Sequence, residues 1–312
     1  MTTDYFKRVE SLNCWEHTIH CEPLEGGITN RNFLVEHGNE KFFVRLGVDI
    51  PEHGVYRFNE LAASRAAYKC GISPEVVYAE IGAMVLRFIN GKTLEPENLR
   101  NISTLKKVIP LLKTCHQQMP LYLPGSSLIF WVFQVIRGYV NTLKESKSRM
   151  IQKFSRFLEI NHELEKTVGT IDLFYGHNDL LSGNFIEDNN RLWLVDWDYA
   201  GFNSPLFDLA NLASNNEYAE GLERGAAGAW RCQMLCLHDD TPGSRPGFLV
   251  LLLLGGSWLR IGGYTGFSGY RSHCHDCPTS RPGGPTTDPS PPLFPSDWSP
   301  DCALPIYFHF FF

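Results

Sequence analysis

The segment from Gly225 to Phe312 contains no Lys, Glu or Asn, although residues 1–224 contain 11 Lys and 20 Glu. The same segment holds 12 Gly, 11 Pro and five of the nine Cys of the chain. The helical spacing of apolar residues ends at 225–228, and the Pro-rich stretch 278–305 favours extended or irregular backbone. We therefore expect residues 225–312 to form an atypical, poorly ordered tail. Its abrupt compositional bias suggests an alternative or frameshifted reading that replaces the normal ending.

Long apolar runs are also scarce. The run Phe248–Leu254 has seven apolar residues, whereas a helix needs about 20 to cross a bilayer. The first residues, Met1–Val9, lack the apolar core of a signal peptide. The four cysteines before residue 225 are irregularly spaced, which suits a reducing compartment. We therefore expect a cytoplasmic chain with no membrane span.

Basic residues are not in excess, since 28 Lys and Arg stand against 34 Asp and Glu, for a formal net charge of −6. This balance offers no general surface for a polyanion, so we expect no nucleic-acid partner. The 312 residues are 43% hydrophobic, which is enough to bury a two-lobed core. The composition up to residue 224 is therefore that of an ordinary globular chain.

One segment carries the pattern of a phosphoryl-transfer centre. Gly176–Asn184 reads Gly-His-Asn-Asp-Leu-Leu-Ser-Gly-Asn, and Asp196 follows twelve residues after Asn184. Phosphoryl transfer needs one carboxylate to orient and deprotonate the attacking hydroxyl, together with oxygen ligands for Mg²⁺ on the phosphates. Asp179 fits the first task, and Asn184 and Asp196 fit the second. Each motif alone is common on protein surfaces, but the joint pattern is far more demanding.

The residues between the two metal-ligand candidates predict a β-hairpin. The polar turn at 188–190 separates two apolar segments, and Asp196 follows directly after the second one. Turns rich in Asn and Asp are typical of hairpins. A hairpin of this length returns Asp196 close to Asn184, so that both oxygens can reach one cation.

A flexible turn upstream could bind phosphate. Gly26, Gly27, Thr29 and Asn30 lie between two short apolar runs, and glycine lets backbone N–H groups approach phosphate oxygens closely. The segment lacks both the Gly-x-Gly-x-x-Gly and the Walker pattern, so a plain hairpin turn fits it equally well on these residues alone.

From about Leu24 to about Glu223 the chain resembles the choline kinase and aminoglycoside phosphotransferase family, best its choline/ethanolamine kinase-like branch. The resemblance implies an α+β, two-lobed protein-kinase-like fold that binds ATP and Mg²⁺. A small β-rich lobe would occupy residues 1–90, and an incomplete helical catalytic lobe would occupy 91–224. Apolar residues at helical spacing over 98–119, 126–146 and 149–168 agree with the second lobe.

The resemblance also implies roles for single residues. The turn with Gly26, Gly27, Thr29 and Asn30 would cover the phosphates of the nucleotide. Arg45, on a strand over 41–46, would hold the α- and β-phosphates, with Glu60 on the next helix as its partner. Lys41 is the competing cation on the same strand.

Four further positions matter for the expected site. The strand over 83–91 would run into the hinge that binds adenine, and Asp208 would brace the catalytic loop. Asp198 could face a cationic substrate or only order the loop around Asp196. We expect His116 to be a core or surface histidine and not a ligand.

The function implied is ATP-dependent phosphorylation of a small hydroxylated amine, most simply choline or ethanolamine, with thiamine, sugars and aminoglycosides as open alternatives. A protein kinase is disfavoured because no Asp-Phe-Gly to Ala-Pro-Glu segment follows Asp196. The competing hypothesis is a catalytically inactive isoform that at most binds nucleotide or a partner, since residues 225–312 replace the region that would complete the acceptor pocket. The oligomeric state does not follow from the sequence.

Overall fold

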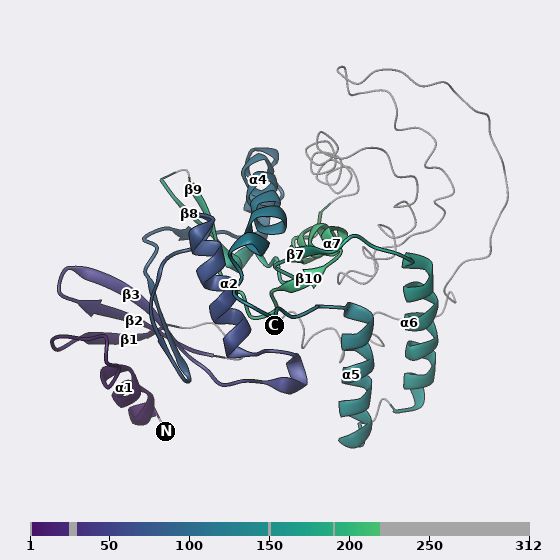
Figure 1. Ribbon diagram of the computed structural model, residues 1–312, viewed down its shortest axis with the longest axis horizontal. Helices are drawn as coiled ribbons and strands as arrows, with labels where there is room; N and C mark the ends of the chain where they lie inside the picture. Colours follow the sequence, from purple (N-terminus) through teal and green to yellow (C-terminus); the bar gives the residue numbers. More distant parts are fainter. Residues whose placement is uncertain (1, 25–29, 149–150, 190, 219–312) are drawn as a thin grey trace, which may run out of the picture.

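The computed structural model describes residues 2–24, 30–148, 151–189 and 191–218. Gly26, Gly27 and Thr29 lie outside the described residues, and so does the expected tail at 225–312. The described part has two lobes, with the small-lobe sheet on the left of Figure 1 and helices α5, α6 and α7 on the right.

The small lobe is built on a five-stranded antiparallel sheet of order β1-β2-β3-β5-β4. Its strands are β1 (His20–Leu24), β2 (Arg31–His37), β3 (Glu40–Leu46), β4 (Val76–Glu80) and β5 (Ala83–Arg87). Two helices accompany it, α1 (Thr2–Glu10) and α2 (Arg57–Lys69), with the short 3-10 turn η1 (Pro51–His53) before α2. The turn between β2 and β3 contains Gly38 at φ 64°, a backbone angle that glycine adopts without strain.

The alternation of side chains along β3 decides which residues meet the cleft. Phe42 and Val44 are buried in the small-lobe core together with Val9 of α1 and Leu12, which lies just after α1. Successive residues of a strand point to opposite faces, so Phe43 and Arg45 project from the other face of the sheet. That second face looks toward the larger lobe, and both residues line the pocket described below.

The larger lobe is mainly helical. Its helices are α3 (Pro96–Leu99), α4 (Ile102–Gln118), α5 (Val132–Glu145), α6 (Phe154–Val168) and α7 (Pro205–Asn215), with 3-10 turns η2 (Met119–Tyr122), η3 (Ile151–Lys153) and η4 (Ser182–Asn184). The three long helices expected from apolar spacing are present as α4, α5 and α6, with later starts than the pattern indicated. This arrangement confirms the expected α+β, two-lobed kinase-like fold.

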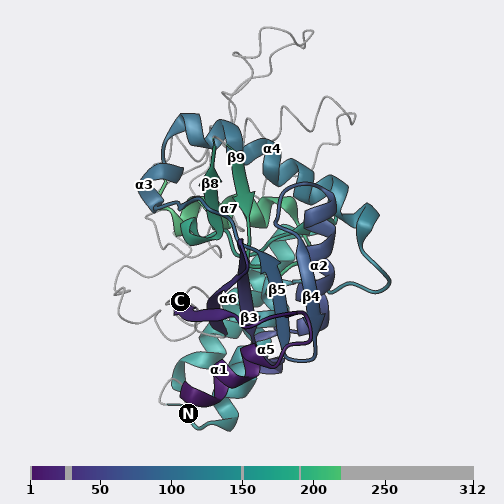
Figure 2. The ribbon, with the colours of Figure 1, turned by 90° about the vertical axis from the view of Figure 1, so that its left-hand side faces the viewer.

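The predicted hairpin is confirmed. β8 (Phe185–Asp188) and β9 (Arg191–Leu194) pair antiparallel, and β6 (Lys92–Thr93) adds a third strand beside β8. A second small sheet joins β7 (Phe174–Gly176) to β10 (Gly201–Asn203). In both ribbon views the hairpin lies next to α4 (Figures 1 and 2). The two small sheets therefore frame the segment that carries the expected catalytic residues.

The main core holds these sheets in place. Leu105, Val108 and Leu112 of α4 are buried with Phe185 and Leu194 of the hairpin. Burying a Leu, Val or Phe side chain contributes about 1.5–3 kcal/mol each, so the hairpin is fixed mainly by its apolar face. Among the described residues, no helix is both long and apolar enough to cross a membrane.

Candidate active site

The predicted catalytic loop, residues 176–184, contains a residue in an unusual backbone conformation soon after β7. Asn178 has φ 65°, in the left-handed region that Asn tolerates better than most residues. Its Nδ2 donates to the carbonyls of Tyr199 (3.0 Å) and Gly201 (3.2 Å), and its Oδ1 accepts from Asn203 Nδ2 (3.0 Å). The side chain of Asn178 therefore ties the loop to the segment that follows Asp196.

His177 makes a second tie between the same two segments. Its buried Nε2 lies 2.9 Å from the carbonyl of Val195, so Nε2 carries the hydrogen and Nδ1 accepts from the backbone N–H of Asp179 (3.3 Å). Burial lowers the pKa of His177, which favours this neutral form. The ring also packs on Trp197 with centroids 4.7 Å apart. His177 thus sets the position of Asp179 relative to the end of β9.

Asp208 of α7 braces the start of the loop. Its carboxylate is 1% exposed and accepts from the backbone N–H groups of His177 (2.9 Å) and Asn178 (2.7 Å) and from His116 Nε2 (2.8 Å). Burial alone would raise the pKa of Asp208, but the bond to His116 and the charges nearby lower it. Asp208 therefore makes contacts of the bracing kind expected for it, and His116 is a buried core histidine that contacts Asp208.

Asp179 has the features of a general base. Its Oδ1 is buried and has no hydrogen-bond partner among the described residues. Burial, followed by the charges of Asp196 and Asp198, raises the pKa of Asp179 well above its ordinary range. A carboxylate held in this state favours accepting a proton from a group placed beside it.

Two backbone contacts link Asp179, Asn184 and the residue before Asp196. Asn184 Nδ2 donates to the backbone carbonyl of Asp179 (2.8 Å), which leaves the amide oxygen of Asn184 as the atom for a cation. The carbonyl of Asn184 in turn accepts from the N–H of Val195 (3.0 Å), directly before Asp196. The hairpin thus returns Asp196 to Asn184 as the sequence predicted.

Asp196 is held by Arg45 across the two lobes. Arg45 Nη1 lies 2.8 Å from Asp196 Oδ1. The backbone of Asp196 is in the left-handed region, with φ 71°. Burial by itself would raise the pKa of Asp196, but the charge and hydrogen bond of Arg45 lower it. Non-glycine residues in this backbone region cluster at functional sites, where the surrounding contacts hold them.

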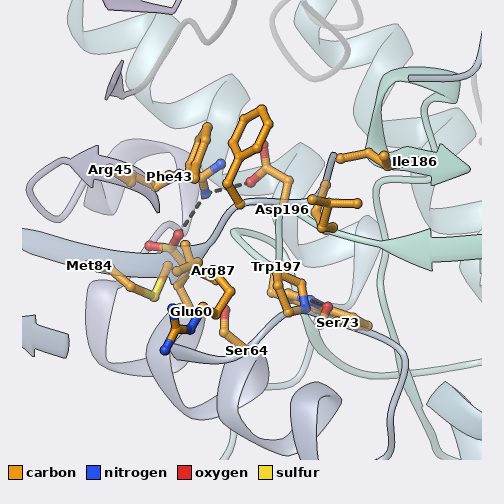
Figure 3. Close-up of a pocket in the computed structure, with 15 residues that line it drawn as sticks. Phe43, Arg45, Glu60, Ser64, Ser73, Met84, Arg87, Ile186, Asp196 and Trp197 are labelled. Carbon is orange, nitrogen blue, oxygen red and sulfur yellow. Dashed lines mark hydrogen bonds and ion pairs between the residues drawn. The ribbon is translucent and has the colours of Figure 1, made fainter. Parts of the chain in front are cut away.

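Arg45 is the centre of a buried ion cluster. Its Nη1 also contacts Glu60 Oε1 (2.6 Å) and Asp198 Oδ1 (3.3 Å), and Figure 3 shows the contacts of Arg45 to Glu60 and Asp196. Arg57 contacts Glu60 and Asp198 as well. Asp198 is thereby engaged in ordering this region, one of the two roles considered for it.

Of two other predicted residues, one lies away from the cluster and the other contacts it. Lys41, the alternative to Arg45, is half exposed and pairs with Glu36 (2.8 Å) on the neighbouring strand, away from the site. Asn30 is buried, and its Nδ2 contacts Asp198 Oδ2 (3.2 Å). The structure therefore brings together six predicted residues, Asn30, Arg45, Glu60, Asp179, Asn184 and Asp196.

A pocket of about 100 Å³ opens beside the cluster, between the small-lobe sheet and the hairpin (Figure 3). Its walls are mainly apolar side chains from both lobes, and Arg45 and Asp196 line it as well. The apolar part includes Phe43, Met84, Leu86, Ile186 and Trp197. The strand β5 runs into residues 88–89, which also line the pocket, as expected for the hinge.

The sequence patterns gave no role to several residues that shape the site. Trp197 donates its indole N–H to Ser73 Oγ (2.8 Å) at the pocket wall, and His177, Asn178 and Arg57 position other groups. Arg57 alone had a readable signal, because it precedes Glu60 by three residues and so lies on the same helix face. The other contacts join segments that are far apart in sequence.

Comparison with known proteins relates the chain to one family. The sequence profile of choline/ethanolamine kinase matches residues 21–233. Protein LicA of Haemophilus influenzae is 31% identical over 203 residues, covering 63% of this chain and 58% of LicA. A probable ethanolamine kinase of Arabidopsis thaliana is 28% identical over 233 residues, covering 69% of this chain and 60% of the relative. The chain thus spans less than two thirds of the length of these two relatives.

Solved structures share the fold. The choline kinase LicA from Streptococcus pneumoniae superposes with a TM-score of 0.65 at 23% identity, covering 81% of this chain and 86% of that one. A LicA structure in complex with AMP gives a TM-score of 0.64 at 25% identity, covering 81% and 85%.

Proposed function

Since the chain belongs to the choline/ethanolamine kinase family, we propose that it transfers the terminal phosphoryl group of ATP to the hydroxyl of a small hydroxylated amine, most simply choline or ethanolamine. The observation that carries the proposal is the buried Oδ1 of Asp179, which has no hydrogen-bond partner among the described residues. Asn184 contacts Asp179, and Asp196 is paired with the buried Arg45. A base, two oxygen ligands and a cation are the parts that phosphoryl transfer requires.

The residues fit a magnesium ion of the kind that accompanies ATP. No group of three or more His, Cys, Asp or Glu in the described residues forms a metal site by itself. Mg²⁺ usually takes one or two protein ligands and completes its shell with water and phosphate oxygens. The amide oxygen of Asn184 and the carboxylate of Asp196 would supply those ligands. When bound, the ion would neutralise negative charge on the phosphates.

The residues also fit a nucleotide. The apolar walls of the pocket, Met84 and Leu86 on one side and Ile186 on the other, suit a flat heteroaromatic ring. Arg45 lies at the polar end of the pocket, where a guanidinium can bind phosphate oxygens in two-point contacts. We propose that Asn30 also helps to bind phosphate. Gly26, Gly27 and Thr29 come shortly before Asn30 in the same turn of the sequence, and we propose the same role for them.

Asp179 would take the proton of the acceptor. As the acceptor oxygen attacks the terminal phosphorus, its hydrogen passes to Oδ1 of Asp179 and the bond to the ADP oxygen breaks. The raised pKa of Asp179, caused by burial and by Asp196 and Asp198, brings the carboxylate closer to the working range of a general base near neutral pH.

The charge around Asp179 favours an amine acceptor. The buried Oδ1 of Asp179 has no hydrogen-bond partner among the described residues, and an ammonium group on the acceptor would be attracted to this carboxylate. Burial raises the pKa of the Tyr199 phenol, and the negative charge of Asp179 adds to this effect. An aromatic face there suits a cationic ammonium.

The free cysteines of the described residues support a cytoplasmic setting; they are Cys14, Cys21, Cys70 and Cys115.

The test is Mg²⁺-dependent release of ADP by the full chain, with choline, ethanolamine, thiamine and an aminoglycoside compared as acceptors. Acceptor-stimulated turnover is expected, and Asp179→Asn should reduce it by about 10²- to 10⁴-fold, the usual contribution of a general base. Asp172→Asn, at an exposed position, serves as the matched control. Folded wild-type protein that binds nucleotide but shows no stimulated turnover would favour the inactive isoform instead.

A further inference from the structure

Arg57, the first residue of α2, is held by its side chain and its backbone. Its Nη1 contacts Glu60 Oε2 (2.5 Å) and Asp198 Oδ1 (3.0 Å), and its Nη2 contacts Asp198 Oδ2 (3.5 Å). Its Nε donates to the carbonyl of Val48 (3.0 Å), and its backbone N–H donates to Asp49 Oδ1 (2.7 Å). The guanidinium therefore sits in one orientation, between a carboxylate of the small lobe and a carboxylate of the large lobe.

The two arginines divide the carboxylate oxygens between them. Arg45 takes Oε1 of Glu60 and Arg57 takes Oε2. At Asp198 both arginines contact Oδ1, and Arg57 and Asn30 contact Oδ2. Arg45 also contacts Oδ1 of Asp196. The second arginine thus satisfies the two carboxylates that have no proposed contact with metal or nucleotide.

The formal charges show why this division matters. Three carboxylates, Glu60, Asp196 and Asp198, face two guanidinium groups, so the cluster carries −1. Removing the positive charge of Arg57 would change the formal charge of these five groups from −1 to −2. At a site this buried, Coulomb attraction is screened less than in water, so Arg45 would be held more strongly on Glu60 and Asp198. A guanidinium held in that way is less able to turn toward phosphate oxygens.

We propose that Arg57 is a positioning residue for the nucleotide, which acts by neutralising Glu60 and Asp198 so that Arg45 can bind phosphate and Asp196 can bind metal. This inference rests on the proposed function. We expect no direct contact between Arg57 and the nucleotide. Its effect is therefore expected on nucleotide affinity and on KM for ATP, and not on KM for the acceptor.

The test compares Mg²⁺·ADP binding by calorimetry for the wild-type full chain, Arg57→Gln and Arg57→Lys. Loss of an outer partner that orients a binding group typically costs 10- to 100-fold, so Arg57→Gln should weaken nucleotide binding by about tenfold or more. Arg57→Lys keeps the charge without the planar fork and should lie between the two. Arg65→Gln, which makes the same change at an exposed position of α2, should bind like wild type.

A charge rescue separates positioning from a merely structural role. If the weakening comes from unneutralised Asp198, then Arg57→Gln combined with Asp198→Asn should recover part of the lost nucleotide affinity, even though a second contact is removed. Thermal unfolding of each variant shows whether it is folded, and Arg57→Lys provides a folded comparison if Arg57→Gln is not.

The outcomes distinguish this inference from the proposed function. Unchanged nucleotide affinity in folded Arg57→Gln, or a further loss in the double variant, would overturn the inference while leaving the kinase proposal in place. Absent turnover in wild type with the expected binding series would support the role of Arg57 and reject the activity. Wild-type protein that binds no nucleotide would overturn both.

Discussion

Asp208 offers the sharpest test of how the catalytic loop is held. We expect Asp208→Asn to destabilise the protein, because this side chain is buried and accepts hydrogen bonds from His177, Asn178 and His116. Asn preserves the shape of Asp but has one acceptor oxygen instead of two. The substitution therefore changes charge and hydrogen bonding without creating a cavity.

The magnitude follows from the individual contacts. Oδ2 of Asp208 serves both His177 N–H and His116 Nε2, and Oδ1 serves Asn178 N–H. If the Asn oxygen takes the first position, its NH₂ faces the N–H of Asn178, and one buried donor left unsatisfied costs about 1–3 kcal/mol. The other two bonds lose their charge-assisted part, about 1 kcal/mol together. The sum is about 3 kcal/mol, or about 6–12 °C in Tm for a unit of this size.

The effect should depend on pH in a definite direction. The folded state holds the pKa of Asp208 below its ordinary value, so this carboxylate contributes stability above the unfolded pKa of about 3.9, and that contribution is lost as pH falls through the lower folded pKa. The difference in unfolding free energy between wild type and Asp208→Asn should be full near pH 7 and shrink below about pH 4.

Urea unfolding at several pH values, followed by tryptophan fluorescence, measures this difference. Asp172→Asn, which removes an exposed carboxylate, should leave the unfolding free energy within about 0.5 kcal/mol of wild type. Equal stability of wild type and Asp208→Asn at neutral pH would refute the bracing role. So would a deficit that grows as the pH is lowered.

Two further predictions concern the phosphate cation and a close backbone approach. Arg45→Met should weaken Mg²⁺·ADP binding by about 10- to 100-fold, because a charged hydrogen bond contributes about 1.5–3 kcal/mol. Lys41→Met, which removes a cation away from the site, should leave this binding unchanged. Equal effects of the two substitutions in calorimetry would contradict the proposal that Arg45 is the residue that binds phosphate. Gly91→Ala would place its Cβ 2.6 Å from the carbonyl oxygen of Glu187, which should cost about 2 kcal/mol, while Gly138→Ala, exposed on α5 with open space around it, should stabilise by about 0.5–1 kcal/mol. Thermal unfolding of both variants checks the opposite signs.

The sequence predicted the parts of the site that depend on short-range spacing. The hairpin could be read because a polar turn separates two apolar strands, and its length alone returns Asp196 to Asn184. The hairpin prediction needs only the chain direction and the period of each strand. The pairing of Arg45 with Glu60, which the structure contains, was implied by the family resemblance and not by spacing.

Other parts could not be read because their cause is long-range. Helix α1 received no prediction, since the apolar face that includes Val9 gains its energy only when the sheet lies beside it. Asp198 stayed ambiguous because its partners Arg57 and Asn30 come from positions 141 and 168 residues earlier in the chain. A carboxylate in a sequence does not indicate which distant cation will neutralise it.

The contacts that hold the catalytic loop bear on the competing hypothesis of an inactive isoform. Besides Asp208, two more residues reach the loop, Asn211 within α7 and Asn216 directly after it. Asn211 Oδ1 accepts from Leu180 N–H, and Asn216 Nδ2 donates to the carbonyl of Leu180 (3.2 Å). Tyr218 then anchors this end of the chain by donating to the carbonyl of Leu99 (2.8 Å).

All of these bracing residues precede residue 225, where the composition changes. Among the described residues, those that position the candidate base, the two candidate metal ligands and Arg45 therefore lie before the unusual segment. The aromatic residues Trp230, Trp258 and Tyr264 of that segment lie outside the described residues. Under the hypothesis of an inactive isoform, the segment would replace the remainder of the acceptor pocket. An isoform that failed as an enzyme for this reason would fail in acceptor recognition and would still bind nucleotide. Loss of both together would point to a defect within the braced loop itself.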